Sequence, residues 1–343
     1  MDFQLSEDQR ALRAGVRDLL AGRFGRDRMR AALDRGEGPG RGLWAELGAA
    51  GFFALRLPED SGGVGLGLPE AVLLFEEAGR VLLPGPLVAT HLAAGAVEGA
   101  AEGRTMVTAV TAVTAATTVT AADGAGPVAG PVADLAGADA VLVLGEGVRV
   151  LTGEPLRALV RGARPVRSLD PFTPLHRLTD LPGPGEPLPG DAARLRGEGA
   201  VLTAAEQLGS AARTLEMAVQ HAREREQFGT PIGSFQAVKH LCAEMLARVE
   251  PARCAVYAAA VTGDPVEIAG AKLLADEAAV GNARDCLQIY GGMGFTWEAD
   301  VHLHLKRAWV RSARWLTAAA AEEILAAELG AAGPQDRDPA IHV

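Results

Sequence analysis

Two short stretches of the chain carry residue types suited to holding a phosphate-bearing ligand. The first, R-E-R-E-Q-F-G-T-P-I-G-S-F-Q, runs from Arg223 to Gln236, and the second, Q-I-Y-G-G-M-G-F-T, runs from Gln288 to Thr296. The forked guanidinium of Arg225 can pair with a phosphate through parallel hydrogen bonds. Gly291 and Gly292 lack a Cβ, so the backbone there can approach a ligand closely. Alternatively, Arg225 caps a helix and the glycines end the next one.

Helices must position both stretches, because apolar residues recur every three or four positions on either side of them. One such series lies N-terminal to Arg223 and consists of Leu208, Ala212, Leu215, Val219 and Ala222. Further helices are expected from about Pro265 to Tyr290 and from about Glu298 to Leu329. Long helices with short connections predict an antiparallel four-helix bundle over residues 191–330, followed by a tail over 331–343.

The N-terminal part, residues 1–98, is also predicted to be helical. Ser6 and Gln9 have the spacing of a capping box, and Pro69 stands where a helix can begin. The glycine-rich run from Pro58 to Gly67 could suggest a dinucleotide-binding loop. Such a loop needs a preceding strand within a βαβ unit, so we interpret this run as a flexible turn between helices.

Residues 99–190 have the pattern of strands and form a reduced β-domain with a linker. The run T-M-V-T-A-V-T-A-V-T-A-A-T-T-V-T, from Thr105 to Thr120, and the runs A-V-L-V-L and V-R-V-L-T are rich in small and β-branched residues. Leu181 to Gly190, L-P-G-P-G-E-P-L-P-G, is predicted to be an exposed connection. The fold class is therefore mainly α with a small central β-domain.

Composition limits the partners. The 343 residues carry a net charge of −10, which argues against nucleic acid and anionic membranes as partners. The three cysteines are widely spaced and are expected to be reduced core thiols, and His302 and His304 lie on different helix faces, so no metal site is predicted. No secretory signal or membrane span is recognisable, and a cytoplasmic protein is expected.

The motifs together resemble the acyl-CoA dehydrogenase family. The N-terminal runs W-A-E-L-G-A-A-G-F, L-P-E-D-S-G-G-V-G and F-E-E-A-G-R match the family too, in the right order, so the resemblance covers about the first 95 and the last 150 residues. It implies an N-terminal α-domain, a β-domain, a C-terminal four-helix bundle and FAD as cofactor. The residues that it assigns to flavin contact are Arg225, Gln227, Phe228, Gln236, Gln288, Gly291 and Gly292.

The same resemblance exposes a missing catalytic base. Dehydrogenation needs a carboxylate that removes the α-proton of the acyl-CoA while the β-hydrogen leaves as hydride to the flavin. The family's usual glutamate position is occupied by Trp315, and the alternative position by Gly199. Glu198 could replace the base after a one-residue slip, and Glu206 is another acid on that helix, although both have the pattern of solvated or capping carboxylates. The middle region also lacks the family's E-P-x-x-G-S-D stretch.

Three hypotheses follow. The chain resembles the short, degenerate subunits of actinobacterial-type heteromeric acyl-CoA dehydrogenases, in which a full-length partner supplies the base, and the run H-L-H-L-K-R-A from His302 supports that subgroup. It could instead be a self-sufficient homo-oligomer with Glu198 as an unorthodox base, or a flavin-free scaffold. The resemblance further implies a heterotetramer in lipid metabolism, a bulky acyl-CoA such as one with a sterol side chain, and an electron-transfer flavoprotein as acceptor.

Overall fold

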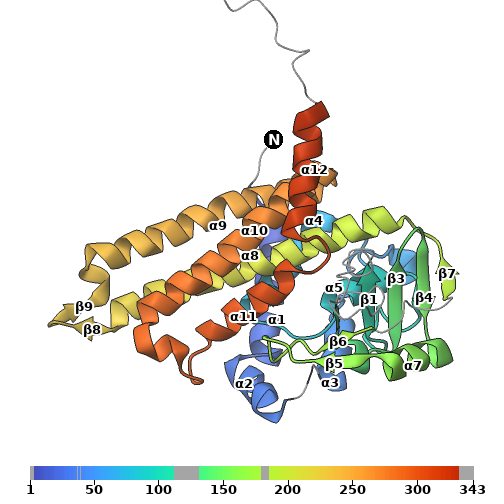
Figure 1. Ribbon diagram of the computed structural model, residues 1–343, viewed down its shortest axis with the longest axis horizontal. Coiled ribbons are helices and arrows are strands. Elements are labelled where there is room, and N and C mark those ends of the chain that lie inside the picture. Colours follow the sequence, from blue (N-terminus) through green and yellow to red (C-terminus); the bar gives the residue numbers. More distant parts are fainter. Residues whose placement is uncertain (1–3, 37, 39, 112–130, 179–184, 332–343) are drawn as a thin grey trace, which may run out of the picture.

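The computed structural model describes residues 4–36, 38, 40–111, 131–178 and 185–331. Long helices form the long axis of the molecule, and two small sheets lie against one end of them (Figure 1). The N-terminal helices pack beside the same end. This arrangement confirms the expected class, a helical N-terminal region, a small β-region and a C-terminal helical bundle.

The N-terminal region consists of helices that bury a shared aromatic core. Their bounds are α1 Glu7–Arg23, α2 Arg26–Arg35, α3 Arg41–Ala49, α4 Leu68–Arg80 and α5 Leu87–Ala93. The predicted capping box is confirmed, because the Gln9 amide donates to Ser6 Oγ and the Ser6 amide to Gln9 Oε1, both at 3.1 Å. The rings of Trp44 and Phe53 pack in the core with centroids 4.9 Å apart and planes tilted by 36°.

In the residues that the structure describes, the β-region contains two sheets and one α-helix. The element bounds are β1 Val107–Thr111, β2 Val132–Ala133, β3 Ala140–Leu144, β4 Val148–Leu151, α7 Gly153–Gly162, β5 Arg164–Val166, β6 Leu175–Arg177 and β7 Glu186–Leu188. The first sheet has the order β1-β3-β4-β7 and the second β2-β6-β5. Only β1 and β3 pair in parallel; the other pairs in these two sheets are antiparallel.

The β-region departs from the sequence-based expectation in helix α7, which was not predicted, and in its last strand. Part of the predicted exposed connection is the strand β7, which pairs with β4 at the edge of the first sheet. Pro187 in this strand has no N–H to donate, which an edge strand tolerates. Most of the predicted strand from Thr105 to Thr120 lies outside the described residues, which include β1 and end at Thr111.

The C-terminal region is the predicted helical bundle. Its element bounds are α8 Ala192–Glu224, β8 Glu226–Gln227, β9 Thr230–Pro231, α9 Gln236–Thr262, α10 Pro265–Tyr290, α11 Val301–Ser312 and α12 Ala318–Ala331. The predicted helix from Pro265 to Tyr290 is confirmed as α10, which begins with a proline after the N-cap Asp264. The strands β8 and β9 form a small hairpin between α8 and α9.

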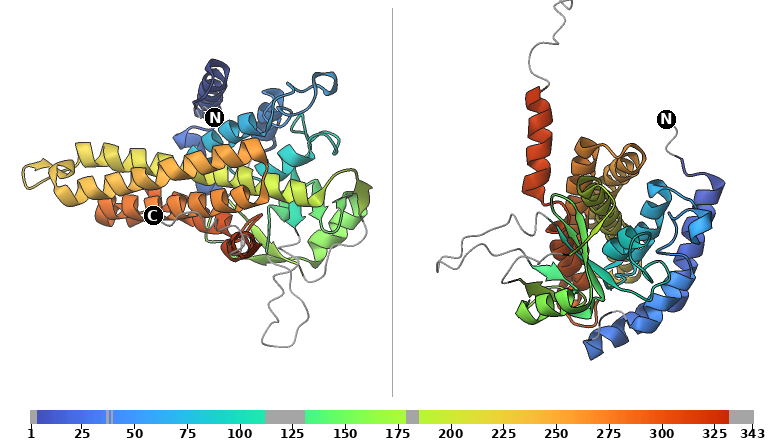
Figure 2. Two further views of the ribbon diagram at one scale, coloured as in Figure 1. Left: turned by 90° about the horizontal axis from the view of Figure 1, so that it is seen from above. Right: turned by 90° about the vertical axis from the view of Figure 1, so that its right-hand side faces the viewer.

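The prediction of one continuous helix from Glu298 to Leu329 was wrong. It consists of α11 and α12, separated by a turn in which Trp315 has a φ of +63°. A right-handed helix requires a negative φ, so one residue in the left-handed region ends it. As a result α12 projects away from the body of the molecule (Figure 2).

Two glycines bring the backbones of α4 and α8 into contact. A Cβ at Gly79 would lie 2.0 Å from the carbonyl oxygen of Glu206, and a Cβ at Gly209 would lie 1.8 Å from that of Glu76. Any larger side chain would force the helices apart. The contact fixes the long helix α8 against the N-terminal region, in keeping with the close helix packing that the alanine- and glycine-rich composition suggests.

No helix in the described part of the chain is both long enough and apolar enough to cross a membrane.

Candidate functional site

The two glycine-containing motifs lie together at the end of the bundle that points away from the sheets (Figure 1). His221, in the last turn of α8, stacks on Tyr290, the last residue of α10, with ring centroids 4.1 Å apart and planes 16° from parallel. Arg225 lies four residues after His221, and Gly291 directly follows Tyr290. The stack therefore joins the ends of two helices and places both motifs at one tip.

Arg225 uses its main chain to end α8 and leaves its side chain exposed. Its N–H donates to the carbonyl oxygen of His221 at 2.9 Å, and its own carbonyl accepts from the Ile232 amide at 2.7 Å. Within the described ranges, its guanidinium has no hydrogen bond or ion pair. The capping alternative is thus met by the backbone, and the charged group remains available to a ligand.

The residues after Arg225 form an exposed turn. Phe228 has a φ of +56°, which is unusual for an aromatic residue, and is 94% exposed. Its ring meets that of Phe235 edge to face, with centroids 6.1 Å apart. Gln227 donates to the neighbouring Glu226 carbonyl at 2.8 Å, and Gln236 contacts His240 at 3.0 Å. These local bonds leave the carboxamide oxygens open to solvent or a partner.

The second motif presents its backbone to the outside. Gly291 has a φ of +60° and a ψ of −142°, a conformation that side chains disfavour. Nothing lies within 4 Å of a Cβ built at either Gly291 or Gly292, so open space borders this turn. Gln288, one turn earlier on α10, is exposed as well. Groups of a bound dinucleotide or of another chain could reach this backbone.

The two positions that the family resemblance assigned to the catalytic base, Trp315 and Gly199, contact each other. Trp315 is buried, with 5% of its surface exposed, and a Cβ built at Gly199 would lie 2.1 Å from Cε3 of its indole. The indole thus covers the face of α8 from which a side chain at position 199 would extend. Neither residue has a side-chain group that accepts a proton. The space beside Gly199 is filled by an apolar ring.

The carboxylate of Glu198 is bound by two arginine side chains. Its carboxylate accepts hydrogen bonds from Arg56 at 2.8 and 3.1 Å and from Arg194 at 2.9 Å. Burial by itself raises the pKa of Glu198, but the bonds from the two arginines outweigh burial and hold that pKa below its ordinary value. A carboxylate held in this way is a weak base, and its contacts favour a structural role.

Glu206 is also paired. It is buried and accepts a hydrogen bond from Arg311 at 2.7 Å. Neither acid that the sequence offers near the base position is therefore free within the chain.

A cleft of about 360 Å³ borders Trp315, between the two sheets and α11. Its walls are mostly apolar and include the rings of Trp309 and Trp315, with two cationic side chains, Arg167 and Arg314. Its volume is near the lower end of the range for small-molecule sites. The cleft contains no acidic side chain among the described residues that line it.

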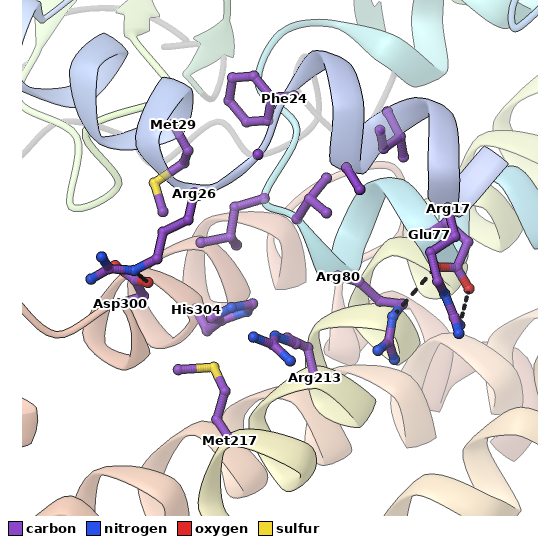
Figure 3. A pocket seen from close by; sticks show the side chains of 15 residues that line it. Arg17, Phe24, Arg26, Met29, Glu77, Arg80, Arg213, Met217, Asp300 and His304 are labelled. Atoms are coloured by element: carbon purple, nitrogen blue, oxygen red, sulfur yellow. Dashed lines mark hydrogen bonds and ion pairs between the residues drawn. The ribbon is translucent and has the colours of Figure 1, made fainter. Parts of the chain in front are cut away.

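Another cavity of about 300 Å³ lies between the N-terminal helices and the bundle (Figure 3). The charged side chains shown there largely pair with each other: Arg17 binds Glu77, and Arg26 binds Asp300. A hydrogen bond of 2.8 Å joins Nδ1 of His304 to Oγ of Ser210. Burial lowers the pKa of His304 to about 3, so this side chain is uncharged at neutral pH. No nucleophile with a base and an orienting acid is found among the described residues that line this cavity.

The structure contains two buried ion pairs on α11 that the sequence analysis did not predict. Arg307 binds Asp170 and donates to the Leu83 carbonyl at 3.1 Å, and Arg311 binds Glu206. Arg307 and Arg311 are four residues apart, so they share one face of α11. This spacing in the sequence could have indicated that the two arginines lie side by side. Their acidic partners, Asp170 and Glu206, are distant in the chain, so the ion pairs could not be predicted. His302 and His304 are both buried, and the described residues contain no cluster suited to a metal.

The comparisons with known proteins agree with this architecture. The family model described as "Acyl-CoA dehydrogenase, N-terminal domain" matches residues 6–127, and "Acyl-CoA dehydrogenase, C-terminal domain" matches residues 195–326. The chain is 36% identical over 304 residues to the acyl-CoA dehydrogenase IpdE2 of Mycobacterium tuberculosis, covering 88% of this chain and 91% of that protein. The chain therefore belongs to the acyl-CoA dehydrogenase family, FAD-dependent oxidoreductases that act on a CH–CH group.

Two solved structures are similar over nearly their whole length. The ChsE4–ChsE5 complex from Mycobacterium tuberculosis matches with a TM-score of 0.82 and 25% identity, covering 96% of this chain and 99% of that chain. A variant of the Tcur3481–Tcur3483 steroid ACAD matches with a TM-score of 0.79 and 26% identity. The match covers 95% of this chain and 99% of that chain. The relatives thus include chains that are solved as parts of complexes.

Proposed function

We propose that this chain is the non-catalytic subunit of a heteromeric FAD-dependent acyl-CoA dehydrogenase. A full-length partner supplies the base and the pocket for the flavin ring, and this chain adds contacts to the flavin from its exposed bundle tip. The observation that carries the proposal is the contact between Trp315 and Gly199, because it puts an indole where the family resemblance predicts the catalytic base.

The length of α8 supports a site shared between chains. Gly199 and Arg225 stand near opposite ends of this helix, and 26 residues at the usual helical rise separate them by about 40 Å. Flavin that contacts Arg225 therefore lies far from the base position of the same chain. A site that needs both functions must take them from two chains.

The residues at the tip fit the diphosphate and adenosine portions of FAD. Arg225 has the charge and the fork geometry for the pyrophosphate, and the open backbone at Gly291 and Gly292 permits close contact. Gln288, Gln227 and Gln236 offer polar side chains beside it. When bound, FAD accepts the hydride that leaves the β-carbon of the acyl-CoA. This chain's part is to bind and orient the cofactor from its adenosine side.

Exposed apolar side chains at the tip support association with another chain. Phe228 is 94% exposed and Phe295, in the turn after α10, is 77% exposed. Large aromatic side chains gain free energy when a partner covers them. The substrate class is proposed from the steroid ACAD relative as a bulky acyl-CoA, such as one with a sterol side chain, with an electron-transfer flavoprotein as acceptor.

The test begins with the chain expressed alone and then together with a full-length family member from the same genome. We expect little FAD to remain with the isolated chain after unbound flavin is removed, and flavin plus acyl-CoA oxidation in the co-purified complex. The visible flavin spectrum, the mass in solution and the turnover would be measured. An isolated chain that holds one flavin per protomer and oxidises acyl-CoA would contradict the proposal and favour the homo-oligomeric alternative.

A further inference from the structure

The cavity of about 300 Å³ between the N-terminal helices and the bundle combines apolar walls with charged side chains (Figure 3). Met29 of α2 and Met217 of α8 point into it from opposite sides. The other apolar lining residues are Leu20, Phe24, Val81 and Leu82. Methionine side chains are flexible and adapt to ligands of irregular shape. The volume admits a small organic molecule, and the lining includes neither the flavin-contact residues nor Trp315.

Arg213 is the guanidinium group of this cavity with the weakest partner. Its hydrogen bond to Oε2 of Glu216 is 3.4 Å long, and the same oxygen accepts a shorter bond of 2.6 Å from Arg80. The other three arginines that line the cavity each bind a carboxylate at 2.7 Å or less; they are Arg17, Arg26 and Arg80. Most of the donor capacity of Arg213 is therefore unused, and its fork geometry matches a carboxylate.

His304 presents a second donor to the same space. It is 3% exposed, and its Nδ1 lies 2.8 Å from Oγ of the buried Ser210. Among the described residues, this nitrogen is the acceptor for the serine hydroxyl, so the serine donates and the neutral ring has its own hydrogen on Nε2. Nε2 has no hydrogen bond within the described ranges, and Figure 3 shows the ring pointing into the cavity, as Arg213 does.

The electrostatic surroundings of His304 favour an anion. Burial first, and then the charges of four arginines led by Arg213, lower the pKa of His304 to about 3. The ring is therefore neutral at neutral pH and lies in a positive potential. An anion beside it would be attracted by the same charges that disfavour protonation of the ring.

The balance of charges around the cavity agrees with this potential. Four guanidinium groups and two carboxylates line it among the described residues. These groups also interact with Glu216, Asp27 and Arg30. Glu76 lies near Arg17 but is bound by Arg253. With all of these neighbours counted, six guanidinium groups face five carboxylates, so one positive charge remains for a monoanion to balance.

We propose that this cavity binds a medium-chain monocarboxylate. Its carboxylate accepts hydrogen bonds from Arg213 and from Nε2 of His304, and its aliphatic chain lies between Met29 and Met217. An inorganic anion would leave these apolar walls uncovered, whereas an aliphatic chain gains free energy from contact with them. A thioester has no anionic oxygen, so the site fits a free acid and not its CoA ester. Because the walls come from α1, α2, α4, α8 and α11, the ligand connects the N-terminal region to the bundle.

Calorimetric titration of the full chain with octanoate, and with the neutral octanamide of the same shape, tests the proposal. We expect one octanoate per chain with a Kd of about 0.1 mM or below, and at least about tenfold weaker binding of octanamide, because only the acid is charged. The titration needs neither flavin nor a partner chain, so its outcome is independent of the proposed subunit role. Equal affinities, or no saturable binding of octanoate, would overturn the proposal.

Arg213→Gln locates the site. It should weaken octanoate binding by about tenfold or more and leave octanamide unaffected. The melting temperature should change by no more than about 1 °C, because the side chain is 42% exposed and its ion pair is long. Arg223→Gln is the matched control, since Arg223 is an exposed arginine of the same helix outside the cavity, and it should bind octanoate normally. An equal loss in both variants, or no loss in Arg213→Gln, would contradict the proposed site.

NMR of the chain with ¹⁵N-labelled histidine gives a readout at the second donor. The ring of His304, assigned through its backbone, should have its hydrogen on Nε2 in the free chain. Octanoate should shift the Nε2 resonance, and octanamide should shift it much less, because a carboxylate is the stronger acceptor. Octanoate binding that leaves this resonance unchanged, or a free ring with its hydrogen on Nδ1, would place the carboxylate elsewhere and refute the proposal.

Discussion

At the scale of single residues, the proposed non-catalytic role depends most on the pair Trp315 and Gly199. The identity of the two residues could be read from the sequence, and the family resemblance predicted that they stand at the positions of the catalytic base. Their mutual contact could not, because it joins residues far apart in the chain and depends on the left-handed backbone of Trp315. The structure shows that the indole of Trp315 fills the space beside Gly199, so the two positions that the family resemblance assigned to the base contact each other.

This contact predicts that Gly199→Ala destabilises the chain. The added methyl would begin 2.1 Å from the indole, so the ring must move, and overpacking of this kind costs about 1–3 kcal/mol. Urea unfolding would measure the loss. In a Trp315→Ala background the same substitution should cost much less, because the ring is gone. An equal cost in both backgrounds would show that the indole is not the cause.

Asp134 predicts a pH dependence. Its side chain is buried, and burial raises its pKa from 3.8 to about 6; Arg314 and Arg307 oppose the rise, while Asp170 and Glu206 add to it. Between these two values the folded chain binds more protons than the unfolded chain, so this residue's contribution to stability falls as pH rises. Above pH 6 the cost reaches about 3 kcal/mol.

Asp134→Asn should remove that cost. Asparagine tolerates the left-handed conformation of this residue, whose φ is +59°, and carries no charge to bury. The free energy of unfolding of the variant relative to the unchanged chain should therefore rise between about pH 4 and pH 6 and then level off. Urea unfolding at several pH values would measure it. A difference that does not change with pH would refute the shifted pKa.

At the scale of elements, periodicity predicted most of the helices and failed where one residue overrides a pattern. The bounds of α10 could be predicted because a proline, an N-cap aspartate and a glycine mark its ends. The break between α11 and α12 could not, since tryptophan in the left-handed region has no sequence signal. Similarly, β7 contains a proline and was predicted as a connection, because only the neighbouring strand β4 shows that it is an edge.

The contact between α4 and α8 predicts opposite effects for two glycine substitutions. Gly209→Ala should destabilise by about 1–3 kcal/mol or more, because its Cβ would lie 1.8 Å from the Glu76 carbonyl oxygen. Gly270→Ala on α10 is the matched control: nothing lies within 4 Å of its Cβ, so alanine's higher helix propensity should stabilise by up to about 1 kcal/mol. Thermal unfolding would compare them. A stabilising Gly209→Ala would show that the two helices are not in close backbone contact.

At the scale of the whole molecule, the separation of functions along α8 is the main argument for assembly. The tip offers an exposed arginine, open glycine backbone and uncovered aromatic rings, while the opposite end is filled by Trp315. These features are complementary to a chain that has a flavin-ring pocket and a base but lacks contacts on the adenosine side. The sequence alone suggested such a division of labour through the subgroup resemblance, but the exposure of the tip residues required the structure.

Arg225→Ala in the co-purified complex provides the sharpest test of this division. Removing a charged hydrogen-bond donor to the pyrophosphate should weaken FAD binding by about 10- to 100-fold, measured by flavin retention and by titration of the flavin-depleted complex. The melting temperature of the isolated chain should not change, because the guanidinium is exposed and has no partner within the described ranges. Arg223→Ala is the control, as Arg223 is an exposed arginine of the same segment outside the flavin-contact set. If both variants weaken FAD equally, the effect is general electrostatics; if neither does, the tip does not contact the flavin and the chain serves assembly alone.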